Sequence, residues 1–139
     1  MAVLSKNIRA FLEEPRFGVL ATINPDGSVQ QTVMWFALDG DELLMNTARG
    51  RRKDLNVLRD PRVSICFEDA YRYLTLRGTV EVVDDHQTSQ ADALLLARRY
   101  HTEDEAQEMM REHFGKQQRI SLRIRVDGVD ARGFEDTSG

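Results

Sequence analysis

The 139-residue sequence has one cysteine, three prolines, few aromatic residues and no long apolar run. The single cysteine, Cys66, cannot form a disulfide within the chain and is typical of a protein from a reducing compartment. No apolar stretch approaches the ~20 residues that a membrane-spanning helix needs. Residues 1–15 lack the apolar core and the cleavage pattern of a secretory signal. We therefore expect a cytoplasmic protein with no membrane partner.

An excess of positive charge is also missing, because the formal net charge is -4 at pH 7. Proteins that bind nucleic acids usually carry a basic domain that neutralises phosphates, so we expect no nucleic-acid partner. His86, His101 and His113 have no spacing that places two of them on one helical face with a carboxylate. No metal site is therefore predicted, and no serine or cysteine lies in a nucleophile motif.

The order of apolar runs and turn signals predicts a single domain over residues 1–139. Ser5 caps a short first helix that ends before Pro15. Alternating apolar runs then predict six main strands, at residues 16–23, 28–38, 41–47, 62–69, 71–83 and 119–126. A helical hairpin is expected at about 86–115, a further short strand at 130–134 and a frayed tail at 135–139. This order favours a mainly β fold with helical cover, built as a small closed barrel.

Several expected strands are apolar on both faces. Val33 and Trp35 share one face of the second strand, whereas Met34 and Phe36 lie on the other. Such strands suit a barrel whose outside is covered by helices or by a second subunit. Cys66 is interpreted as a small buried strand residue. In the helical hairpin, we expect one stripe formed by Ala91, Leu94, Leu95 and Arg98.

The basic stretch NTARGRRKDLN, residues 46–56, is either a solvated turn or a binding site for an anion. Three features favour the anion. The stretch follows a strand that ends in Thr47, Gly50 permits close approach of the backbone, and the cations fall on the first turn of a helix. A phosphate held by charge-assisted hydrogen bonds, each worth ~1.5–3 kcal/mol, would offset the crowding of like charges. Asn56 lies one turn after Lys53 and could add a polar contact.

The segment from GVLATINPDGSVQQTVMWF through DGDELLMNTARGRRKDLNVLRDPRVSICF resembles a known family. It is similar to the flavin-binding split β-barrel family typified by pyridoxamine 5'-phosphate oxidase, and more closely to the branch that uses the deazaflavin coenzyme F-420. The resemblance implies a homodimer of six-stranded split barrels, with two equivalent cofactor sites at the subunit interface.

The resemblance also implies which residues bind the cofactor. Its phosphate would lie against Thr47, Arg51, Arg52 and Lys53. Its tricyclic ring would lie along Val33, Met34 and Trp35, with Asn46 nearby. Asn56 would steady the phosphate loop, and the segment around Tyr71 to Tyr73 would reach the site from the other subunit.

The resemblance implies an oxidoreductase that uses coenzyme F-420 for hydride transfer to a small conjugated or activated substrate. The cofactor performs most of that chemistry, so the missing metal and nucleophile motifs do not exclude catalysis. One alternative is an FMN-dependent reductase or oxidase. Another is a non-catalytic protein that binds flavin, deazaflavin or haem. The second strand lacks the arginine and lysine with which the oxidase itself holds the phosphate, which argues against pyridoxamine phosphate as the substrate.

Overall fold

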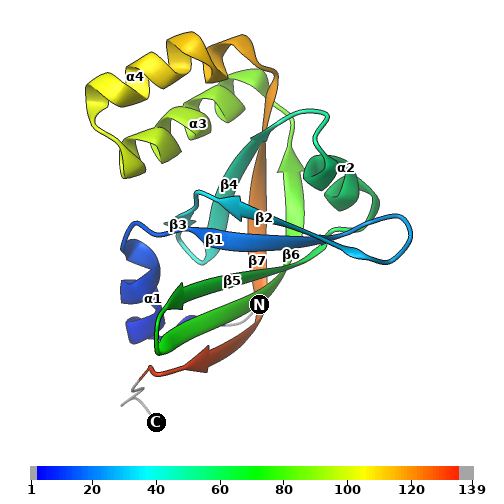
Figure 1. Ribbon diagram of the computed structural model, residues 1–139, viewed down its shortest axis with the longest axis vertical. Coiled ribbons are helices and arrows are strands. Elements are labelled where there is room, and N and C mark those ends of the chain that lie inside the picture. The colour runs from blue at the N-terminus through cyan, green and yellow to red at the C-terminus, as the bar shows by residue number, and fades with distance from the viewer. Residues whose placement is uncertain (1–2, 135–139) are drawn as a thin grey trace.

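The computed structural model describes residues 3–134 (Figure 1). They contain four α-helices, one short 3-10 helix and seven strands. The predicted tail at 135–139 lies outside the described residues. In chain order the elements are α1 Lys6–Glu13, β1 Gly18–Ile23, β2 Val29–Met34, β3 Ala37–Asp39, β4 Glu42–Ala48, α2 Arg52–Arg59, β5 Arg62–Asp69, β6 Arg72–Val83, α3 His86–Tyr100, α4 Glu103–Glu112, the 3-10 helix Phe114–Lys116 and β7 Arg119–Arg132.

All seven strands belong to one antiparallel sheet with the order β2-β1-β5-β6-β7-β4-β3. Its two edge strands, β2 and β3, are consecutive in the chain and are joined only by Trp35 and Phe36. Three Cα-to-Cα steps span at most about 11 Å, so the sheet has to curl until its edges approach each other. The mainly β fold with helical cover is confirmed, but the prediction of six strands is wrong, because there are seven in the described part of the chain.

The extra strand arises where one strand was predicted over residues 28–38. Phe36 turns into the core, where it is 0% exposed and packs edge-on against Phe67 at 4.7 Å. This turn removes the Phe36 backbone from the β-ladder. Its N–H donates instead to the Tyr100 hydroxyl at 3.1 Å, and that hydroxyl donates to the Arg16 carbonyl at 2.5 Å. A side chain of α3 thus satisfies the backbone at the break between β2 and β3.

The strand predicted at 130–134 is also not separate, because β7 runs without interruption from Arg119 to Arg132. It pairs with β4 along its first half and with β6 along most of its length. A bulge at Asp127 of β7, opposite Arg77 and Gly78 of β6, lets the two long strands bend together. This long central strand connects the end of the sheet that α3 and α4 cover to the opposite end (Figure 1).

The face that α3 buries differs from the expected one. In α3 the buried residues are Ser89, Ala93, Leu96 and Ala97. Ala93, Leu96 and Ala97 lie two positions after members of the predicted stripe, which corresponds to about 200° around the helix and therefore to nearly its opposite side. The succession of three leucines at 94–96 leaves the periodicity ambiguous, so packing of α3 on β4 and β7 selects the face.

One further expectation about burial is wrong as well. Cys66 is exposed on β5 rather than buried. In α2, Leu55 and Leu58 are 55% and 58% exposed, while Asp54 and Asn56 are buried. The helix α2 therefore turns its polar side toward the sheet and its leucines outward. No helix within residues 3–134 has the length and apolar character needed to cross a membrane.

Candidate functional site

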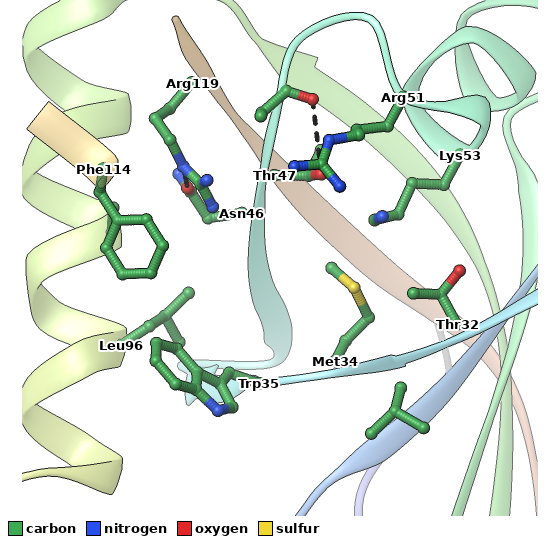
Figure 2. Close-up of a pocket in the computed structure, with 13 residues that line it drawn as sticks. Thr32, Met34, Trp35, Asn46, Thr47, Arg51, Lys53, Leu96, Phe114 and Arg119 are labelled. Carbon is green, nitrogen blue, oxygen red and sulfur yellow. Dashed lines mark hydrogen bonds between the residues drawn. The ribbon is translucent and has the colours of Figure 1, made fainter. Parts of the chain in front are cut away.

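A cavity of about 330 Å³ lies where β2, β4, the start of α2, the middle of α3 and the start of β7 meet (Figure 2). Ligand pockets in proteins start at about this volume. Its lining residues are Thr32, Val33, Met34, Trp35, Asn46, Thr47, Ala48, Arg51, Lys53, Ala93, Leu96, Phe114 and Arg119. No aspartate or glutamate is among them, so the cavity is basic and partly apolar.

The structure brings together most of the residues that the resemblance implied. Those lining the cavity are Val33, Met34, Trp35, Asn46, Thr47, Arg51 and Lys53. Arg52, Asn56 and Tyr73 do not line it within this chain. Their roles in binding, like those of the lining residues, stay predictions.

Each of the three residues outside the cavity has a different position. Arg52 is exposed at the first position of α2. Asn56 is 1% exposed, and its amide donates to Thr22 Oγ1 at 3.0 Å and Asn24 Oδ1 at 2.9 Å, so it holds α2 against β1. Tyr73 is 45% exposed on β6.

The loop between β4 and α2 forms because Gly50 adopts a φ of +89°, which favours glycine. The Gly50 N–H donates to Asp54 Oδ2 at 2.8 Å, which closes the turn. Arg51 is the N-cap residue of α2, and its side chain makes no capping hydrogen bond. The first amides of α2 thus have no side-chain cap, a local arrangement that favours an anion at this helix end.

Three cations line the cavity and remain unpaired. Within residues 3–134, Arg51, Lys53 and Arg119 form no ion pair with a carboxylate. Burial and the nearby Arg51 lower the pKa of Lys53, and Asp54 offsets part of this effect. Burial and Arg51 also lower the pKa of Arg119 to about 10. Because these causes penalise the protonated forms, a bound anion would stabilise the site.

Arg49 is not part of this unpaired group. Its side chain forms a salt bridge with Asp84, and its backbone N–H donates to the Gln118 carbonyl at 2.7 Å. The positive charge available to a ligand therefore comes from Arg51 and Lys53 in the predicted cluster, together with Arg119 from β7.

One wall of the cavity is aromatic. Trp35 stacks on Tyr100 with ring centroids 5.3 Å apart and planes 13° apart, and it meets the edge of Phe114 at 6.0 Å. Met34 and Leu96, which are 8% and 2% exposed, make the adjoining surface apolar. A flat, apolar wall beside a cationic end suits a ligand with a planar ring and an anionic group.

Sequence reasoning missed Arg119 and Phe114. Phe114 lies in the 3-10 helix that follows α4, whereas Arg119 reaches the cavity because β7 pairs with β4, with Arg119 opposite Ala48. The only sequence signal was an arginine at the start of a predicted strand, and its pairing partner could not be read from the chain. Within the described residues, no group of three His, Cys, Asp or Glu side chains is placed to hold a metal ion.

The curled antiparallel sheet and its basic, aromatic-walled cavity define a mainly β protein with a pocket of ligand-binding size. The sequence profile of the pyridoxamine 5'-phosphate oxidase family matches residues 4–132. The chain therefore belongs to the pyridoxamine 5'-phosphate oxidase family, which confirms the family predicted from the sequence.

Individual relatives agree with this assignment. A pyridoxine/pyridoxamine 5'-phosphate oxidase from Kineococcus radiotolerans is 34% identical over 86 residues, which are 60% of this chain and only 39% of that protein. The structure of an F-420 reductase is 34% identical, covers 88% of this chain and 94% of its own, and superposes with a TM-score of 0.71. A conserved hypothetical protein from Mycobacterium tuberculosis is 29% identical, covers 99% of this chain and 89% of its own, and has a TM-score of 0.79.

Proposed function

We propose that the protein is an oxidoreductase that uses coenzyme F-420 for hydride transfer to a small conjugated or activated substrate. The observation that carries this proposal is the cavity itself, which joins an unpaired cationic end to an apolar, aromatic wall. Thr47, Arg51 and Lys53 would hold the phosphate, and Val33, Met34 and Trp35 would contact the ring. The bound deazaflavin would supply the two-electron hydride chemistry.

The chain itself would contribute position, electrostatics and exclusion of water. Ala93, Leu96 and Met34 are each less than a tenth exposed and keep one side of the cavity apolar. Charges next to such a surface interact more strongly than charges in water. The lining offers no carboxylate as an acid or base, which suits a reaction whose chemistry the cofactor performs.

Two observations favour the deazaflavin over FMN. The F-420 tail contains a phosphate, a lactate and glutamates and is more anionic than the tail of FMN, which suits three unpaired cations in one small cavity. The second observation is that the structure of an F-420 reductase is 34% identical to this chain and superposes on 88% of it. FMN remains the alternative cofactor.

We further propose that two copies of the chain form a homodimer that covers an exposed apolar surface. The interface would cover apolar side chains that are more than half exposed on β2, on the neighbouring α2 and just before β1: Val29, Val33, Leu55, Leu58 and Phe17. Val33 also lines the cavity, so the cavity opens onto the same surface. A charge at this surface, as in Leu58→Glu, should convert a dimer into monomers in light-scattering measurements. A wild-type protein that is monomeric at high concentration would refute the dimer.

The proposed cofactor can be tested with the fluorescence of Trp35, the single tryptophan, which lines the cavity. Titration with coenzyme F-420 should quench it at concentrations at least about tenfold lower than titration with FMN. Tight FMN binding with no response to F-420 would contradict the proposal. In a second assay, reduced F-420 should be reoxidised only when a conjugated substrate is added. Binding without reoxidation across a broad substrate panel would instead indicate a non-catalytic binding protein.

A further inference from the structure

Arg119 is held in one orientation at the cavity by three neutral contacts. Its Nε donates to Asn46 Oδ1 at 2.8 Å, and its Nη1 donates to Gln117 Oε1 at 2.6 Å. The face of its guanidinium lies 4.5 Å from the centre of the Phe114 ring. Figure 2 shows Arg119 on one side of β4 and Arg51 and Lys53 on the other. The side chain is thus ordered before any ligand binds.

The orientation of Asn46 is fixed in turn by buried partners. Its Nδ2 donates both to the Ser89 carbonyl at 2.9 Å and to Ser121 Oγ at 3.1 Å. The Ser121 hydroxyl donates to Asp92 Oδ2 at 2.7 Å. Because both amide hydrogens of Asn46 are occupied, its oxygen has to face Arg119. Asn46 therefore acts as a positioning residue for Arg119, and no hydrogen on its amide is left for a ligand.

The charge of Arg119 has no partner inside the described chain. The partners of its two hydrogen bonds are amide oxygens, and the charge that acts on its pKa is the positive Arg51. Lys53 differs, because Asp54 partly offsets its charge. A planar guanidinium whose remaining N–H groups are free matches the two oxygens of a carboxylate or a phosphate.

We propose that Arg119 binds a second acidic group of the ligand, next to the phosphate held by Thr47, Arg51 and Lys53. The cavity would then select ligands that carry two neighbouring acidic groups over ligands with one phosphate. The proposal deepens the proposed function, since the F-420 tail carries acidic groups beyond its phosphate, but it can be tested without that cofactor.

The test compares two small probes that differ by one acidic group, glycerol 3-phosphate and 3-phosphoglycerate, in titrations that follow Trp35 fluorescence. The wild-type chain should bind 3-phosphoglycerate more tightly, by about five- to tenfold, since one partly exposed charged hydrogen bond is gained. Arg119→Gln should abolish this preference and change the affinity for glycerol 3-phosphate less than about threefold. Arg119→Lys keeps the charge but loses the planar set of paired N–H donors, so it should retain part of the preference for 3-phosphoglycerate.

Arg125→Gln is the matched control, because Arg125 lies on the same strand, is exposed and does not line the cavity. It should retain the full preference. A wild-type chain without a preference would overturn the proposal. So would an Arg119→Gln variant that keeps the preference, or one that loses affinity for both probes equally, since Arg119 would then belong to the phosphate site.

Parallel titrations with coenzyme F-420 and FMN separate this proposal from the proposed function. If neither cofactor binds but Arg119→Gln still abolishes the preference between the two probes, the proposed function fails and the role of Arg119 stands. If F-420 binds equally well to the wild type and to Arg119→Gln, and both distinguish the two probes alike, the role of Arg119 fails while the cofactor assignment stands.

Discussion

Replacing Lys53 with methionine should weaken cofactor binding strongly without destabilising the unliganded fold. Lys53 lines the cavity from the first turn of α2, forms no ion pair within the described residues, and lies near Arg51. Methionine keeps an unbranched apolar stem of similar length and removes only the charge. The variant therefore separates the contribution of the ammonium group from that of packing.

The expected loss follows from one charged hydrogen bond to phosphate, which is worth ~1.5–3 kcal/mol. Since each ~1.4 kcal/mol corresponds to a factor of ten, the dissociation constant for F-420 should rise about 10- to 100-fold. Lys6→Ala is the control, because Lys6 is exposed on α1 away from the cavity. Its affinity should equal that of the wild type.

The same substitution should weaken cofactor binding but not the stability of the unliganded protein. The pKa of Lys53 is lowered by burial in the folded state, whereas an unfolded lysine keeps its usual value of 10.5. The unfolded chain thus binds more protons, and the wild type should gain stability as the pH rises toward 10.5. Lys53→Met should be at least as stable as the wild type at pH 7, and the difference should shrink as the pH rises. Normal cofactor binding combined with earlier melting would refute this reasoning and make Lys53 structural.

Three further substitutions test the fold around the site. Gly78→Ala places a Cβ about 2.5 Å from the Arg125 carbonyl oxygen, next to the β7 bulge. The free energy of unfolding in urea should therefore fall by about 1–3 kcal/mol, and an unchanged midpoint would contradict this. Thr102→Ala removes the capping box with Glu105 and should lower the free energy of unfolding by about 1 kcal/mol. Thermal melting followed by circular dichroism measures this loss, which should be much smaller in Thr102→Ser. Asn56→Ala should lower the free energy of unfolding by about 1–3 kcal/mol, because the residue is buried. Cofactor affinity should change less than about threefold, because Asn56 lies outside the cavity. A larger loss of affinity than of stability would show direct contact with the cofactor.

Features that depend on a few neighbouring residues could be predicted from the sequence. The cap at Ser5 forms as expected, and the capping box at Thr102 joins residues only three positions apart. Gly27 and Gly40 adopt the positive φ angles that their turns require. The basic loop at residues 46–53 lies between a strand end and a helix start, as its pattern indicated. In each case the partners are separated by at most a few positions, so local geometry alone determines the arrangement.

The remaining features depend on contacts between distant parts of the chain. The second strand breaks at Phe36 because Tyr100, sixty-four positions later, satisfies its backbone. The buried face of α3 is chosen by packing, since three successive leucines fit more than one face. Arg119 enters the cavity only because β7 pairs with β4 in a register that sets it opposite Ala48.

The same division applies to the candidate site. The sequence contained the phosphate-binding half in one continuous stretch, so its charges, glycine and helix start could be recognised together. The other half is assembled from the second strand, the third helix and the last strand. Which of their side chains meet is decided by the strand register and by the close packing of the core, and both result from long-range interactions that a single sequence does not display.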